Sequence, residues 1–167
     1  MADRKEILGI DIGQVLVEQE PEDKSLSFGG PNYLHSPEMP HAFRVLRRLS
    51  IERFEGRLFL VTDCMRKIRR KREEWLLHHD FYGRVGIPVV LPTYCWTSAH
   101  KANVCHDLEL THMIDDNPKA LSGMDSDKCK LILFRPLERR VKEYAGFVAQ
   151  STTRVESWLE VEKLLLP

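Results

Sequence analysis

The stretch Ile7-Leu8-Gly9-Ile10-Asp11-Ile12-Gly13-Gln14-Val15 decides the fold. Its first four residues are apolar or small, as in a strand buried on both faces, and Asp11 ends the run. An acid that directly follows such a strand lies at the carboxyl edge of a parallel sheet, where open α/β proteins bind their ligands. The strand at 7–10 therefore predicts both the sheet and the place of the site.

Short apolar runs alternate with segments of helical period over the rest of the chain. Strands are expected at 7–10, 57–61, 87–91, 112–114 and 130–134. Helices are expected from Ser36–Pro40 onward, at 65–79 and 101–108, from Pro118 onward, and at 138–149 and 156–165. This alternation predicts an α/β fold of the three-layer Rossmann-like kind, with a mainly parallel central sheet and helices on both faces.

The segment 14–38 interrupts this alternation. Its turn-rich centre predicts a hairpin between 15–17 and 26–28, which would form a small flap beside the site. An insertion of about 20–25 residues is too short for a helical cap domain. We therefore expect residues 1–167 to form a single domain without a large cap.

The chain has 25 Lys and Arg residues and 25 Asp and Glu residues, so its formal net charge is zero. This balance argues against a protein that coats nucleic acid with a wholly basic surface. The apolar runs are far shorter than the roughly 20 residues of a membrane span, and the charged N-terminus lacks the apolar core of a secretion signal. With four cysteines and no C-x-x-C pair, the sequence predicts a cytoplasmic protein with reduced thiols that does not bind a membrane.

Polar residues also end other predicted strands. Thr62 follows the second strand, Asp115 and Asp116 follow the fourth, and Lys101 opens the helix before it. Carboxylates from two strands can share a hard cation such as Mg²⁺, while a hydroxyl and an ammonium suit the oxygens of a phosphoryl group. Two adjacent acids repel each other unless a cation or a shared proton intervenes. Together with Asp11, these residues predict a site for a phosphate and a divalent metal.

These residues resemble the four motifs of the haloacid dehalogenase (HAD)-like superfamily, and they occur in the same order along the chain. The first motif, D-x-D-x-T/V after an apolar strand, is matched by Asp11-Ile12-Gly13-Gln14-Val15. The other three are matched by Leu58-Phe59-Leu60-Val61-Thr62, by Lys101 and by Ile114-Asp115-Asp116-Asn117-Pro118. The resemblance covers about residues 7–135 and implies a HAD-like core with a phosphoryl-transfer site.

The resemblance also implies a role for each matched residue. Asp11 would be the nucleophile and would form an aspartyl-phosphate that water then hydrolyses. Mg²⁺ would be held by Asp11, Asp116 and the backbone carbonyl of Gly13, with Asp115 as a further partner. The residues that bind the phosphoryl group would be Gly13, Thr62, Asp63 and Lys101. The implied activity is that of a Mg²⁺-dependent phosphoric monoester hydrolase acting on a nucleotide, a sugar phosphate or a phosphorylated macromolecule.

The chain departs from the family pattern at Gly13, where the family has the Asp that serves as general acid and base. A positioned proton donor is typically worth about 10²–10⁴ in rate. Glu18, His35 and Asp63 are the candidates to replace it. The alternative function is therefore a phosphate-binding or scaffold protein that keeps the fold and has lost efficient chemistry.

The segment Arg66–Arg72 holds six cations in seven residues at the start of a predicted helix. A solvated helix face is the favoured interpretation. Cations at a helix start oppose the helix dipole, so an anionic substrate or a nucleic acid is the alternative.

Three other kinds of site fit the sequence less well. A zinc site made of Cys95, His100, Cys105 and His106 matches no structural zinc spacing. A response-regulator receiver would carry its acidic pair after the first strand. A dinucleotide site would need a G-x-G-x-x-G turn, which the two glycines of 9–13 do not form.

Overall fold

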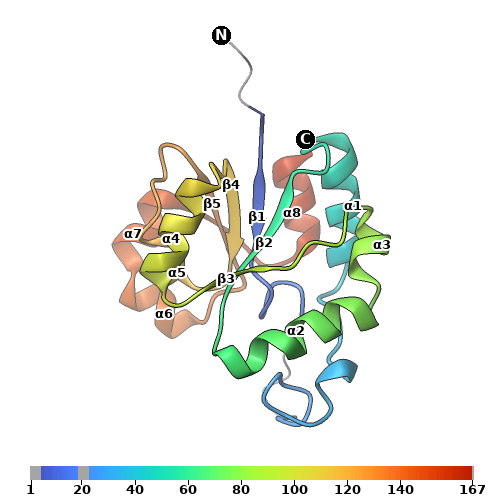
Figure 1. Cartoon of the computed structure of the whole chain (residues 1–167). Helices are drawn as coiled ribbons and strands as arrows, with labels where there is room; N and C mark the ends of the chain where they lie inside the picture. Colours follow the sequence, from blue (N-terminus) through green and yellow to red (C-terminus); the bar gives the residue numbers. More distant parts are fainter. Residues whose placement is uncertain (1–4, 19–22, 167) are drawn as a thin grey trace.

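The computed structural model describes residues 5–18 and 23–166 and contains a six-stranded sheet with helices on both faces (Figure 1). Its strands are β1 (Leu8–Ile10), β2 (Leu58–Asp63), β3 (Thr93–Cys95), β4 (His112–Asp115), β5 (Lys130–Phe134) and β6 (Thr152–Val155). They lie in the order β3-β2-β1-β4-β5-β6, and every neighbouring pair is parallel. This arrangement confirms the predicted α/β class with a parallel central sheet.

The helices form the two outer layers. They are α1 (Ala42–Glu52), α2 (Arg66–His78), α3 (Phe81–Val85), α4 (Ser98–Asp107), α5 (Pro118–Leu121), α6 (Glu138–Glu143), α7 (Ala145–Ser151) and α8 (Trp158–Leu165), with a short 3-10 helix η1 at Tyr33–His35. Helices α1, α3 and α8 cover one face, and α4 to α7 cover the other (Figure 1). Each face has its own apolar core, because β1 and its neighbours are buried from both sides.

Strand β1 gives Leu8 and Ile10 to one of these cores, and its Gly9 lies against Leu110 and Met113 of the other. A Cβ atom at Gly9 would come within 2.4 Å of Leu110 Cδ1 and 2.7 Å of Met113 Sδ, so glycine permits the close approach of β4. Leu8 and Ile10 on either side of it are fully buried. The strand is thereby fixed in register, with Ile10 opposite Ile114, and the residues that follow each strand meet at one edge.

Two details of the predicted sheet are wrong. Residues 87–91 form no strand, and the third strand is Thr93–Cys95 instead. Pro88 lies within the run and Pro92 follows it, and neither has an N–H group to donate to a neighbouring strand. Val89 and Leu91 are exposed. In addition, β6 at Thr152–Val155 was not predicted, because its sequence carries little apolar signal and one face is exposed.

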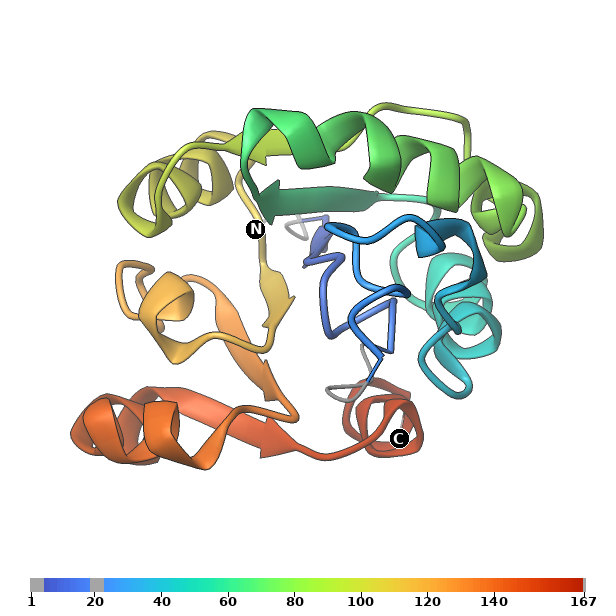
Figure 2. The same cartoon turned by 90° about the horizontal axis from the view of Figure 1, so that it is seen from below.

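The predicted hairpin between 15–17 and 26–28 does not form. The carbonyl of Ile12 instead accepts hydrogen bonds from the N–H groups of Val15, Leu16 and Val17, which curls the chain directly after β1. We call residues 14–38 the flap. Its described part contains η1 and an isolated antiparallel bridge between Val17 and Glu38, but no α-helix or longer strand, and it lies between α2 and α8 (Figure 2).

The predicted helix at 138–149 is divided at Tyr144 into α6 and α7. Among the described residues, no helix has the length and apolar character needed to cross a membrane.

Candidate active site

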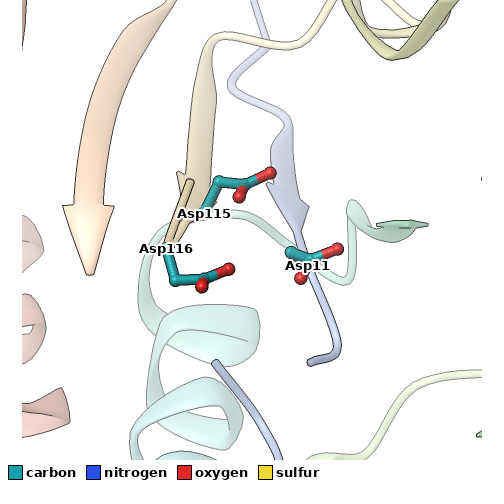
Figure 3. A group of neighbouring side chains, drawn as sticks. All are labelled: Asp11, Asp115 and Asp116. Atoms are coloured by element: carbon teal, nitrogen blue, oxygen red, sulfur yellow. The ribbon is translucent and has the colours of Figure 1, made fainter. Parts of the chain in front are cut away.

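Three carboxylates converge at the carboxyl edge of the sheet: Asp11 after β1, Asp115 at the end of β4, and Asp116 (Figure 3). The N–H of Asp11 donates to the carbonyl of Ile114 at 2.9 Å, so the pairing of the two strands places these residues side by side. One oxygen from each carboxylate lies within 4.8 Å of the others. We call this group the acidic floor.

Lys101 of α4 lies beneath the acidic floor and is fully buried. Its Nζ is 2.9 Å from Asp11 Oδ1, 2.6 Å from Asp115 Oδ2 and 3.5 Å from Asp63 Oδ1. Burial alone would lower the pKa of Lys101, but the carboxylates of Asp11, Asp115 and Asp63 outweigh it and raise the pKa well above its ordinary value. The ammonium is therefore a permanent positive charge under the floor.

One ammonium does not neutralise the carboxylates around it. Burial raises the pKa of Asp115 and of Asp116, and the charge of Asp11 raises both further. Asp115 and Asp116 thus hold their protons more tightly than exposed carboxyl groups do, and the donor atoms of all three carboxyl groups are oxygens. Three such donors within 4.8 Å of one another, from two buried carboxyl groups and the half-buried Asp116, fit a hard divalent cation such as Mg²⁺.

A pocket of about 250 Å³ opens over the acidic floor. Asp63 lines it next to the floor, and Arg72 of α2 lines it beside Gly13. Arg139 and Arg140, which open α6, also line the pocket. We call the three arginines the arginine wall. The pocket therefore joins a buried anionic floor to a cationic wall, which is an arrangement suited to a phosphate and a metal together.

The predicted residues Thr62 and Lys101 are fully buried, and neither is among the described residues that line this pocket. Arg72 separates Thr62 from the pocket, and its Nη1 donates a hydrogen bond to Thr62 Oγ1. The hydroxyl oxygen of Thr62 thus accepts from Arg72, and its own proton is left for a further acceptor.

Gly13 lies directly against Arg72. A Cβ atom at position 13 would be 3.1 Å from Arg72 Nη2 and 4.0 Å from Asp11 Oδ2. The guanidinium group therefore occupies the space into which a side chain at position 13 would begin to extend. The sequence predicted a vacant proton-donor position, and the structure places an arginine there.

The three candidate replacement acids occupy different places. Glu18 accepts a hydrogen bond from Arg135 at 3.3 Å, and His35 in η1 packs edge-on against His78. Neither of the two lines the pocket, whereas Asp63 does. Asp63 is thus the candidate acid that the structure brings to the site.

The basic run Arg66–Arg72 is not one uniformly solvated face. Lys71 donates to the carbonyl of Gly30 at 3.1 Å and lies over the ring of Tyr33, both in the flap. Arg69 stacks on Tyr94 and Trp96, and Arg70 pairs with Glu74. Much of the charge in this run is therefore used within the protein, to hold the flap and to line the pocket.

Arg139 and Arg140 were not predicted as site residues from the sequence. A signal was present, because both residues follow the fifth predicted strand, whose carboxyl end meets the same edge as Asp11 and Asp115. The four residues of the disfavoured zinc arrangement, Cys95, His100, Cys105 and His106, do not gather as a metal-binding group in the part of the chain that the structure describes.

No protein-family model and no curated protein sequence matches this chain. Among solved structures, its fold is similar to that of the D,D-heptose 1.7-bisphosphate phosphatase from B. bronchiseptica, solved in complex with magnesium and phosphate. The two chains have a TM-score of 0.64 and 12% sequence identity over 96% of this chain and 98% of that one. At this identity the likeness shows a common fold, which agrees with the predicted three-layer α/β core of the Rossmann-like kind.

Proposed function

We propose that this chain is a Mg²⁺-dependent phosphoric monoester hydrolase that works through an aspartyl-phosphate on Asp11. The observation that carries the proposal is the acidic floor, a group of buried and half-buried carboxylates that line a pocket together with three arginines. The shared fold with a phosphatase that binds magnesium and phosphate supports it. The phosphorylated substrate would lie in the pocket with its phosphoryl group between floor and wall.

Asp11 is the carboxylate best placed for attack. Lys101 and the hydrogen bond to Ile114 fix it from below, so its other oxygen, Oδ2, can face the pocket. Lys101 also stabilises the charge that gathers when a carboxylate approaches a phosphate dianion. Its burial beneath the floor supports this electrostatic role, while Asp11 supplies the oxygen atom that attacks the substrate.

The metal would be held by Asp11, Asp116 and the carbonyl of Gly13, with Asp115 as a further partner. When bound, Mg²⁺ supplies positive charge to the oxygens of the phosphoryl group, which otherwise repel the floor. The residues of the chain then have separate tasks: Asp11 attacks, Asp115 keeps Lys101 and the N–H of Asn117 in place, and Arg72 offers N–H donors.

The test is hydrolysis of p-nitrophenyl phosphate with Mg²⁺ and with EDTA. We expect turnover that depends on Mg²⁺ and falls by on the order of 10⁴-fold or more in Asp11→Asn, because that variant lacks the nucleophile. Asp107→Asn is the matched control, since Asp107 is an exposed carboxylate on α4 outside the pocket. A folded protein that binds Mg²⁺ and phosphate but turns over no phosphate ester would favour the alternative, a binding or scaffold protein.

A further inference from the structure

Arg72 occupies a position that is constrained from several sides. Its Nη1 donates to the buried hydroxyl of Thr62, and its guanidinium lies 5.5 Å from the ring centre of Phe28 in the flap. Its Nη2 is the nearest atom to the missing side chain of Gly13. Contacts with β2 and with the flap therefore hold the guanidinium at the pocket, and the missing side chain at position 13 leaves room for it.

A guanidinium and a carboxyl group at this position have different chemistry. Arginine presents several N–H donors in a planar fork that matches a phosphoryl group, and it stays protonated at any physiological pH. It can hold phosphoryl oxygens, but it cannot give a proton to a departing oxygen. Substituting a fixed cation for an acid thus favours binding of the phosphoryl group while removing help for the leaving group.

The protonation of the leaving group matters most when that group is strongly basic. An alkoxide released from an alkyl phosphate needs a proton, and a positioned acid is typically worth about 10²–10⁴ in rate. A carboxylate, a phosphate or a phenolate leaves as a stable anion without one. The pair of Gly13 and Arg72 therefore has consequences for which phosphate compounds can react.

Building on the hydrolase function proposed above, we infer that Arg72 binds the phosphoryl group in place of the missing acid, and that the substrate carries its phosphoryl group on a weakly basic oxygen. Acyl phosphates, phosphoanhydrides and aryl phosphates share this chemistry. Simple alkyl phosphates lack it.

The two steps balance without a proton donor. In the first, an oxygen of the Asp11 carboxylate bonds to phosphorus, the bond from phosphorus to the leaving oxygen breaks, and its electron pair departs on that oxygen as an anion. In the second, water bonds to phosphorus and the bond to Asp11 breaks. The Asp11 carboxylate returns, and both protons of the water remain on the released dihydrogen phosphate.

The first arm of the test compares kcat/KM for acetyl phosphate, p-nitrophenyl phosphate and glycerol 3-phosphate, with Asp11→Asn correcting for spontaneous hydrolysis. We expect turnover of the first two and a value about 10²–10⁴ lower for glycerol 3-phosphate. Similar values for all three, or an alkyl rate lost selectively in Asp63→Asn, would overturn the inference, because a side chain would then be donating the proton. That result would leave the hydrolase standing, whereas turnover of none would overturn the hydrolase itself.

The second arm measures binding of inorganic phosphate by calorimetry in the presence of Mg²⁺. We expect Arg72→Ala to weaken it about tenfold or more and Arg72→Lys to give an intermediate value, since lysine keeps the charge and loses the fork. Arg66→Ala is the matched control, because Arg66 is an exposed cation of the same helix outside the pocket. Thermal unfolding checks that each variant is folded, and Arg72→Lys serves if Arg72→Ala is not. Unchanged phosphate binding in a folded Arg72 variant would contradict the assignment.

Discussion

The acidic floor and the arginine wall face each other across one pocket, but the chain builds them differently. Asp11, Asp115 and Asp116 follow or end adjacent parallel strands, so the register of β1 and β4 sets their positions. Arg72 comes from the second turn of α2, and Arg139 and Arg140 come from the start of α6. The floor is placed by backbone, whereas the wall reaches the pocket through long side chains.

Because the two groups are built differently, we expect substitutions in the acidic floor and in the arginine wall to have different effects. A residue of the floor cannot move without moving a strand, so changes there alter the reaction and the stability of the fold together. A residue of the wall is half-buried or exposed, and its side chain can adjust. Changes in the wall should therefore affect binding and selectivity while the fold remains.

The largest effect on stability is expected from Lys101→Met. The substitution leaves Asp11, Asp115 and Asp63 without their shared counter-charge in a buried place. Removing one partner of a buried ion pair typically costs about 3–5 kcal/mol. We expect the free energy of unfolding, measured in urea without metal, to fall by about that amount. Lys119→Met, at an exposed lysine of α5, should leave that free energy within about 0.5 kcal/mol of wild type. Equal free energies of unfolding for the two variants would show that the buried charges of the site matter no more to stability than an exposed lysine does.

The acidic floor was largely open to prediction from the sequence, and the arginine wall was not. An apolar run followed by Asp is a local signal, and parallel strands bring such ends together whatever the loops do. The position of Arg72 depends on the turn at which α2 approaches Gly13, which no local pattern encodes. The strand at 87–91 was predicted wrongly for a different reason: its apolar residues are typical of a strand, but Pro88 within the run and Pro92 after it have no N–H group to pair with a neighbouring strand.

The second prediction concerns pH without metal. The pKa values of Asp115 and Asp116 are raised in the folded protein above the ordinary 3.8, to about 6 and about 8, chiefly by burial. The folded state thus holds these protons more tightly, so this contribution to stability is complete below pH 3.8 and is lost as the pH rises to about 8. In EDTA we expect the free energy of unfolding to fall by on the order of 2 kcal/mol between pH 6 and 8.

The chosen pH window excludes most of an opposing effect. Burial lowers the pKa of His112 from 6.5 to about 4. The contribution of His112 to the free energy of unfolding is therefore lost as the pH falls, and it is nearly complete above pH 6.5. The decline above that value therefore belongs to the floor. Excess Mg²⁺ should abolish it, and a free energy that stays level or rises with pH in EDTA would contradict the charge balance described for the floor.

The third prediction isolates one carboxylate. Asp116→Asn removes a half-buried charge that repels Asp11 and Asp115, so the metal-free variant should be more stable than wild type at pH 8 by about 1 kcal/mol. The same variant should lose the stabilisation that Mg²⁺ gives wild type, which is about 2.7 kcal/mol at a hundredfold excess over Kd. Thermal unfolding at pH 8 with and without Mg²⁺ measures both. If Mg²⁺ stabilises the variant as much as it stabilises wild type, Asp116 is not a ligand of the metal.

The smallest effect is expected from the outer part of the wall. Arg139 is exposed, and an exposed charge contributes about 0–1 kcal/mol to an ionic contact. Arg139→Ala should therefore raise KM for acetyl phosphate by no more than about fivefold and leave kcat unchanged. Lys142→Ala, at an exposed cation of α6 outside the pocket, is the control and should change neither. A large loss of kcat in Arg139→Ala would mean that the wall takes part in the chemical step.

The central claim is that the acidic floor presents Asp11 as the nucleophile to a phosphoryl group. The most direct measurement is to mix the protein with Mg²⁺ and acetyl phosphate, quench with acid during turnover, and locate any bound phosphoryl group by peptide mass spectrometry. We predict one phosphoryl group on the peptide that contains Asp11, and none in Asp11→Asn. Turnover of acetyl phosphate by a protein that carries no phosphoryl group on Asp11, or undiminished turnover in Asp11→Asn, would contradict the account.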